Sequence, residues 1–198
     1  MGNILRGNNS SGMPRCLEGA RYYAQWAGAP YHVYGGRKGA NDYADDINTR
    51  SLMTNWLGGG SPYMPALQGK KVPIELSLAV HSDAGYNKDG KTTWGSLAIC
   101  TTNFNDGMLN SGISRMTSKD LAKALLKNLV SDLRQQYGEF SERYLWDRNY
   151  SETRLPEVPA AIIETLSHQS FPDMKIGQDP MGKFTIARSL YKTILRYV

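Results

Sequence analysis

Short apolar runs that alternate with longer amphipathic segments constrain the fold of this 198-residue chain more than any other feature. Runs of strand character, each followed by polar or turn-forming residues, cover residues 74–81, 94–102 and 158–166. The three- and four-residue apolar spacing of a helix occurs in the segments 42–57, 117–138 and 182–198. Strands that alternate with helices of ten or more residues predict an α/β domain.

Weaker patterns complete the predicted order of elements. The stretch "PRCLEGARYYAQWAG" predicts a helix with Pro14 in its first turn. The stretches "PYHVYGG" at 30–36 and "RYLWDR" at 143–148 predict strands. Residues 1–13 are rich in Gly, Asn and Ser, which predicts a flexible lead-in. We therefore expect a single domain over residues 1–198, a three-layer sandwich in which helices flank a central, mainly parallel sheet.

The composition excludes several classes of protein. Hydrophobic residues make up 40% of the chain and charged residues 21%, as in folded rather than disordered proteins. The net charge of +5 is scattered along the chain, so nucleic-acid binding is not indicated. No apolar run approaches the roughly 20 residues of a membrane span. Only Cys16 and Cys100 are present, which excludes a disulfide scaffold and leaves their pairing open.

Two of the predicted strands end in a residue that could carry chemistry. "LSLAVH" ends at His81 and "AAIIE" ends at Glu164, and ligand sites of open α/β sheets gather at such strand ends. Each residue alone also fits a plain structural role. Together they suit a hydrolytic zinc site, which needs imidazole or carboxylate ligands, a water and a carboxylate base. Glu18 is a third acidic candidate, although an acid early in a helix also favours the helix dipole.

Four stretches, in this order, resemble the zinc-dependent N-acetylmuramoyl-L-alanine amidases that cleave peptidoglycan. They are "CLEGARYYAQWAGAPYHVYGGRKGANDY", "DINTRSLMTNWL", "LSLAVHSDAG" and "LPEVPAAIIETLSHQSFPDMKIGQDPMGKFTIARSLYKTI", and the resemblance extends over roughly residues 14–198. It implies an α/β fold in which Glu18 and His81 bind Zn²⁺ and Glu164 is the catalytic carboxylate. Arg50 and Asn55 fall at positions that the resemblance assigns to substrate binding.

One part of the family pattern is missing. The family opens with a strand that ends in Asp-Pro-Gly-His-Gly-Gly, whose histidine is the first zinc ligand, and this chain has no such stretch. A hydrolytic zinc normally keeps three protein ligands. Three explanations stay open: the strand and its histidine precede Met1, His168 completes the site, or the site binds without cutting. His32 is a weaker candidate because the predicted strand places it in the core.

The resemblance implies a zinc-dependent hydrolase that cleaves the amide bond between N-acetylmuramic acid and L-alanine in peptidoglycan or a muropeptide. It also implies an extracytoplasmic location, with the targeting signal outside this chain. Two alternatives of other classes stay open. One is an amidase-fold module that binds cell-wall glycan or a partner without catalysis, and the other is a zinc peptidase that acts on another substrate.

Overall fold

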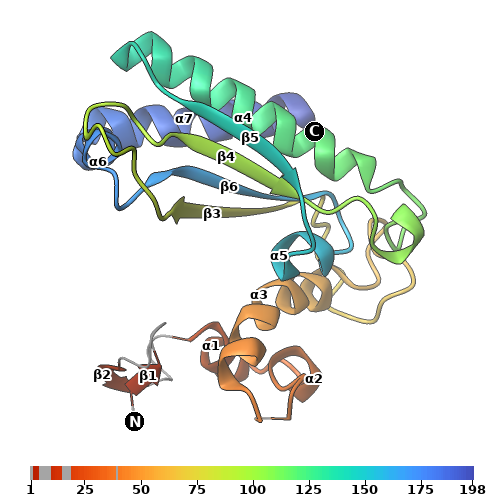
Figure 1. Ribbon diagram of the computed structural model, residues 1–198. Helices are drawn as coiled ribbons and strands as arrows, with labels where there is room; N and C mark the ends of the chain where they lie inside the picture. Colours follow the sequence, from red (N-terminus) through yellow and green to blue (C-terminus); the bar gives the residue numbers. More distant parts are fainter. Residues whose placement is uncertain (1, 5–9, 15–18, 39) are drawn as a thin grey trace.

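The computed structural model describes residues 2–4, 10–14, 19–38 and 40–198. The larger part of the chain builds a four-stranded sheet with the strand order β3-β6-β4-β5 (Figure 1). Its elements are β3 (Ser77–Asp83), β4 (Ser96–Cys100), the short turn η2 (Asn105–Gly107), α4 (Met116–Tyr137), β5 (Glu142–Asp147), α5 (Ser151–Arg154), β6 (Ala160–Ser167), α6 (Phe171–Gln178) and α7 (Pro180–Tyr197).

A smaller group of elements from the N-terminal part of the chain lies below the sheet in Figure 1. Three helices of this group pack around a small apolar cluster of Ala24, Ala29 and Val33. The elements are β1 (Gly2–Ile4), β2 (Ser10–Pro14), α1 (Ala20–Trp26), α2 (Tyr31–Tyr34) and α3 (Asp42–Gly58). None of the helices in the described part of the chain combines the length and apolar character needed to cross a bilayer.

The direction of each strand follows from the connection that leads to it. The two outer pairs, β3 with β6 and β4 with β5, are parallel, whereas the central pair, β4 with β6, is antiparallel. A parallel neighbour needs a long crossover, and α4 supplies one between β4 and β5. No helix lies between β3 and β4, so β4 returns in the opposite direction. The mainly parallel α/β sheet expected from the sequence is therefore present, with one antiparallel pair at its centre.

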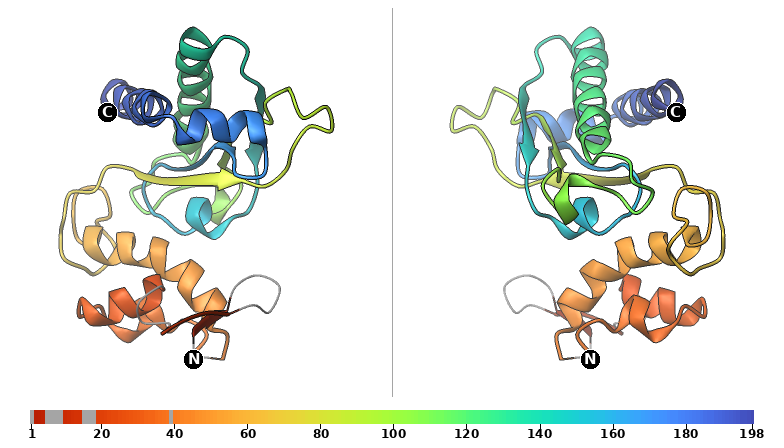
Figure 2. Two further views of the ribbon diagram at one scale, coloured as in Figure 1. Left: turned by 90° about the vertical axis from the view of Figure 1, so that its left-hand side faces the viewer. Right: turned by 90° about the vertical axis from the view of Figure 1, so that its right-hand side faces the viewer.

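The helices divide between the two faces of the sheet (Figure 1). On one face, α4, α6 and α7 cover the main core, to which α4 contributes the buried stripe Leu121, Leu125, Leu129 and Leu133. The other face carries a smaller apolar cluster of Leu97, Ile99 and Ile162. Helix α5 lies on this second face, with α3 beyond it. Figure 2 shows α7, in blue, at the periphery of the molecule, away from α1, α2 and α3.

The structure corrects several local predictions. Residues 31–34 form the helix α2 and not a strand. The consecutive residues Val33 and Tyr34 both pack at the apolar cluster, which the alternating sides of a strand would not allow, while Tyr31 and His32 are exposed. His32 is therefore not a core residue of a strand. Pro14 ends β2 and does not open a helix, since α1 begins at Ala20. Within the segment expected to be a flexible lead-in, the described residues 2–4 and 10–14 form the antiparallel pair β1 and β2, and the flexibility of residues 1–13 stays a prediction.

The ends of the long helices agree better with the sequence. Gly138 ends α4 with a φ of 81°, a conformation that glycine adopts without steric cost. At the other end, Arg115 occupies the N-cap position, two residues before the segment expected to be helical, and no side chain caps the helix there. Cys100 is buried in β4, and Cys16 lies outside the described residues.

A buried carboxylate holds together the edge of the sheet at which β3 and β6 end. Asp173, in the first turn of α6, accepts hydrogen bonds from the backbone N–H groups of Trp94 at 2.7 Å, Gly95 at 3.0 Å and Ser167 at 2.8 Å. It also accepts one from the hydroxyl of Ser170, the N-cap residue of α6. A single side chain thus joins the start of β4, the end of β6 and the start of α6.

Replacing this carboxylate tests its structural importance. Asp173→Ala leaves three backbone donors without their acceptor, so we expect the free energy of unfolding to fall by about 3 kcal/mol. Urea denaturation followed by circular dichroism measures the loss. Glu139→Ala, at an exposed position, is the control and should change the value by less than about 0.5 kcal/mol. Equal effects of the two substitutions would show that Asp173 does not hold this edge.

Candidate functional site

His81 and Glu164 lie side by side on the second face of the sheet. The parallel register of β3 and β6 pairs His81 directly with Glu164. Side chains of a strand alternate between faces, so His81 shares the face of Ala79, and Glu164 shares that of Ile162. Both Ala79 and Ile162 belong to the smaller apolar cluster. The Nδ1 atom of His81 is 3.8 Å from Oε1 of Glu164.

A second carboxylate reaches the same imidazole from α5. An oxygen of Glu152 lies 3.2 Å from Nε2 of His81, and Arg50 of α3 lies 3.4 Å from the other oxygen of Glu152. The imidazole therefore has a carboxylate at each nitrogen. The side chains of Glu152 and Glu164 are 15% and 14% exposed, and that of His81 is 32% exposed, so the group is partly shielded from water and still open on one side.

This arrangement changes the proton affinity of all three groups. The hydrogen bond to Glu152 raises the pKa of His81, and the charges of Glu152 and Glu164 add to this effect against the opposing effect of burial. Burial raises the pKa of Glu164, and the nearby Asp83 raises it further. Burial also acts to raise the pKa of Glu152, but its hydrogen bond to His81 and the charges of His81 and Arg50 lower it overall.

One oxygen of Glu164 is available for a ligand. Its Oε2 atom is buried and has no hydrogen-bond partner within the described residues. A buried carboxylate oxygen without a partner is costly in a folded protein, because it has lost its water without a replacement. A carboxylate in this situation, with a raised pKa, can accept and return a proton during a reaction.

Helix α3 places the remaining predicted residues in two different situations. Arg50 contacts Glu152 and Asp46, and its side chain is 43% exposed, so it can still reach a ligand. Asn55 uses its amide to join α3 to the segment after α5: its Nδ2 donates to the carbonyl oxygen of Leu155, and its Oδ1 accepts from the N–H of Glu157. In this structure Asn55 thus supports the position of α5.

The two other candidate ligands are His168 and Glu18. His168 is exposed, and its Nδ1 lies 3.1 Å from the hydroxyl of Ser82 rather than beside the imidazole of His81. Glu18 lies outside the described residues. Arg21, three residues further on, donates its backbone N–H to Asp46 of α3. The described start of α1 therefore lies beside the turn of α3 that carries Arg50.

Sequence reasoning missed Glu152. The residue lies in the polar segment "RNYSETRLPE", which resembles an ordinary loop between two strands. The available signal was an acidic residue in a loop that follows a strand of an α/β domain, where functional groups often lie. That signal does not indicate that the loop folds back as α5 beneath β6 and brings the acid to His81.

The chemistry of these side chains fits a divalent metal ion such as Zn²⁺. Imidazole nitrogen and carboxylate oxygen, the donors of His81 and Glu152, are ligands that zinc takes in hydrolytic sites. Glu164, beside them, has a buried oxygen without a partner that can accept a proton. Over the ranges that the structure describes, no group of three or more His, Cys, Asp or Glu side chains is already arranged to hold a metal ion. Here the two ring nitrogens of His81 instead face its two carboxylate neighbours, at 3.2 Å from Glu152 and 3.8 Å from Glu164.

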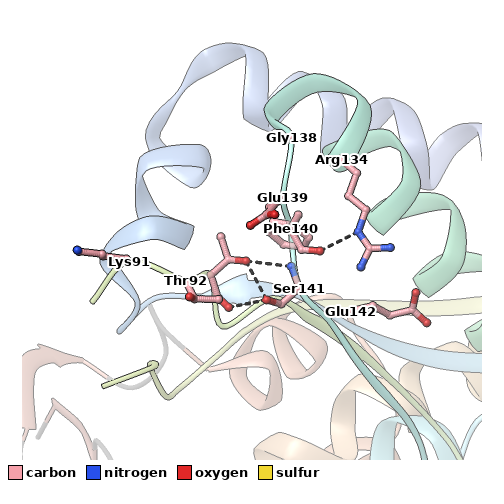
Figure 3. Close-up of a pocket in the computed structure, with 9 residues that line it drawn as sticks. Lys91, Thr92, Arg134, Gly138, Glu139, Phe140, Ser141 and Glu142 are labelled. Carbon is pink, nitrogen blue, oxygen red and sulfur yellow. Dashed lines mark hydrogen bonds between the residues drawn. The ribbon is translucent and has the colours of Figure 1, made fainter. Parts of the chain in front are cut away.

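A separate cavity of about 810 Å³ lies between the end of α4, the start of β5 and the loop at 91–93 (Figure 3). Its polar groups already bind one another: Arg134 donates to the carbonyl oxygen of Phe140, and the hydroxyl of Ser141 donates to the carbonyl oxygen of Thr93. The cavity lacks an imidazole, and neither Glu152 nor Glu164 lines it. The two strand-end residues that the sequence singled out therefore lie outside this cavity, in the cluster of His81, Glu152 and Glu164, which we call the His81 group.

Comparison with solved structures identifies the fold. An N-acetylmuramoyl-L-alanine amidase from Clostridium difficile 630 matches 83% of this chain and 77% of its own, with a TM-score of 0.53 and 16% identity. The CwlD amidase from Clostridioides difficile, solved in complex with the GerS lipoprotein, matches 90% of this chain and 80% of its own, with a TM-score of 0.54 and 13% identity. The amidase Ami1 from Mycobacterium smegmatis matches 80% of this chain and 63% of its own, with a TM-score of 0.53 and 17% identity.

The similarity between this chain and known proteins lies in the fold. No protein-family model matches the sequence, and no curated protein matches it. At 13–17% identity, structural similarity establishes a shared architecture and not a shared activity. The chain has the fold of the N-acetylmuramoyl-L-alanine amidases, as the resemblance in sequence implied.

The contact between His81 and Glu152 predicts a measurable titration in the metal-free protein. In chelator-treated protein, His81 is expected to titrate above its ordinary pKa, and Glu152→Gln should lower that pKa because the hydrogen bond and the negative charge weaken. A raised histidine pKa stabilises the fold below about pH 6.5, and this stabilisation is lost as the pH rises through the folded-state pKa. NMR of the imidazole resonances measures the shift.

The same spectra contain their own references. The chain has three histidines, and the resonances of His32 and His168 should respond little to Glu152→Gln because neither contacts Glu152. An unchanged His81 titration in the variant would contradict the contact.

Proposed function

We propose that this chain is a zinc-dependent hydrolase that cleaves the amide bond between N-acetylmuramic acid and L-alanine in peptidoglycan. The observation that carries the proposal is the pairing of His81 with Glu164 on adjacent strands, with one buried oxygen of Glu164 left without a partner. The amidase fold adds support, because the structural similarity to solved amidases covers most of this chain.

Each residue has a distinct task in this proposal. His81 and Glu18 would hold the Zn²⁺, which, when bound, polarises the amide carbonyl and increases the acidity of the attacking water. Glu164 accepts a proton from that water as the carbon–oxygen bond forms. It then donates the proton to the leaving nitrogen as the carbon–nitrogen bond breaks. The burial that raises the pKa of Glu164 suits both steps.

Arg50 would bind an anionic or carbonyl group of the substrate. Its guanidinium already lies at the rim of the group, paired with Glu152 and Asp46, and remains substantially exposed. A substrate carboxylate can exchange with one of these partners, because a guanidinium presents several N–H donors in one plane. Asn55 would act indirectly, by holding the segment that carries Glu152.

The central test separates catalysis from metal binding. Glu164→Gln should lower the rate of peptide release from muropeptides by about 10³-fold, because it removes the proton acceptor. Its zinc content, measured by elemental analysis after dialysis, should stay close to that of the unaltered chain. Glu139→Gln makes the same chemical change at an exposed position and should leave both values unchanged.

The third zinc ligand can be assigned by comparing two substitutions. We infer that Glu152 is a better candidate than His168, since it already lies 3.2 Å from His81. Glu152→Ala should therefore lower zinc affinity by at least about tenfold, whereas His168→Ala should leave it unchanged. Isothermal titration with Zn²⁺ measures both. The opposite result, a loss of zinc affinity in His168→Ala alone, would identify His168 as the third zinc ligand.

The second candidate function is a module of amidase fold that binds cell-wall glycan without cutting it. It is favoured by the finding that the described residues include no metal cluster already formed. The two functions give different results with the unaltered chain. A chain that binds peptidoglycan in a sedimentation assay but retains no zinc and releases no peptide is the binding module, and the hydrolase proposal then fails.

A further inference from the structure

The outer face of α7 carries a row of exposed apolar side chains, interrupted by Arg188, which lines a hollow together with Asp132 of α4. Five large apolar side chains, four on the helix and one on the residue that follows it, are between 50% and 65% exposed: Met181, Phe184, Tyr191, Leu195 and Val198. The opposite side of the same helix is the one that packs on the main core, through Leu190, Ile186 and Tyr197. A surface helix of a globular domain normally presents polar residues on its outer side. Helix α7 is instead apolar on two opposite sides.

The spacing of the exposed residues is that of a helix–helix seam. Together with Arg188, the five residues follow one another at intervals of three, four, three, four and three. This is the alternation of the two inward positions of a heptad repeat, and it confines the six side chains to an arc of about 100° around the helix. The seam extends along the whole of the 18-residue helix, about 27 Å.

The seam is complementary to itself when two copies run in opposite directions. In that orientation Met181 faces Val198 of the other copy, and Phe184 faces Leu195. Arg188 then lies against the ring of Tyr191, where a guanidinium gains a cation–π interaction. Every residue of the seam thus has a suitable partner.

The residues beside the seam do not oppose this pairing. The antiparallel arrangement brings Thr185 near Lys192 of the other copy, and Ala187 near Ile194, so no two like charges lie directly opposite each other at these positions. Lys192 is in addition paired with Asp132 of its own α4 at 2.6 Å. A parallel pair would instead place Arg188 against Arg188 in the middle of the seam.

We propose that α7 is the contact surface of a homodimer, in which the helices of two copies pack in antiparallel orientation around the pair Arg188 and Tyr191. Each exposed apolar side chain offers on the order of 100 Å². With the flanking residues, such a dimer buries roughly 1,200 Å² in total, at the lower end of specific interfaces. Interfaces of this size are typical of weak, reversible association, so we expect a dimer that dissociates in the micromolar range. The His81 group lies on the other face of the sheet and stays open in the dimer.

Sedimentation velocity with the 198-residue chain tests the proposal. Over the micromolar range we expect a reversible equilibrium between monomer and dimer. Phe184→Lys and Leu195→Glu each place a charge against an apolar side chain, so each variant alone should associate at least about tenfold more weakly. An equimolar mixture of the two should regain association, because the introduced ammonium then faces the introduced carboxylate and the other layer keeps Phe184 against Leu195.

Tyr86→Lys is the matched control. It changes an equally exposed aromatic residue in the loop between β3 and β4, and should leave association unchanged. All variants should keep the circular dichroism spectrum and zinc content of the unaltered chain, so the dimer can fail without affecting the proposed hydrolase. A chain that stays monomeric at every concentration, or a mixture without recovery, overturns the proposal. The proposal also fails if the substitutions weaken binding of the chain to phosphatidylglycerol vesicles but leave its self-association unchanged. That result would assign the face to a lipid surface.

Cysteine cross-linking tests the orientation. In a Cys16→Ser background, with Cys100 buried, Phe184→Cys mixed with Leu195→Cys should form an intermolecular disulfide under mild oxidation. Neither variant should cross-link with itself, because identical positions lie about 16 Å apart along the antiparallel pair. A disulfide between two copies of Phe184→Cys would show a parallel pair and contradict the proposed register.

Discussion

The carboxylate of Asp173 is the interaction on which the candidate site depends most. It accepts hydrogen bonds from backbone groups at the start of β4 and the end of β6, and it lies in the first turn of α6. These groups would otherwise be buried donors without acceptors, which a folded chain does not tolerate at three adjacent positions. Because the bonds fix the end of β6 against β4, they also fix the strand that carries Glu164. The register of β6 with β3 then brings His81 to its side.

The electrostatics of the site follow from this packing. Arg50, Glu152, His81 and Glu164 form a row in which positive and negative groups alternate, contributed by α3, α5, β3 and β6. The row is partly buried, so each charge affects its neighbours more strongly than it would in water. Glu164, at the end of the row, has one imidazole neighbour and one oxygen without a partner, and its pKa is raised. This asymmetry supports the proposed role of Glu164 as the proton acceptor.

Most long elements were predictable because each has a period that a single sequence displays. The stripe of α4 and the apolar run of β6 are repeated patterns over many residues, and a glycine ends α4. The short elements failed for a physical reason. "PYHVY" satisfies the strand pattern, but five residues cannot distinguish a strand from one turn of helix, and the choice depends on which cluster Val33 reaches. Helices α5 and α6 were not predicted, because they are short and lie in segments rich in residues typical of turns.

The sequence by itself determined the α/β class, the long elements and the two residues at the strand ends, because periodicity and strand polarity are local properties. Only the tertiary structure decided which side chains meet. It brought Glu152 to His81, gave Asn55 a supporting role, placed His168 beside Ser82, and left an apolar seam exposed on α7. Contacts between residues 70 or more positions apart depend on how the layers pack, and no local pattern in the chain encodes that packing.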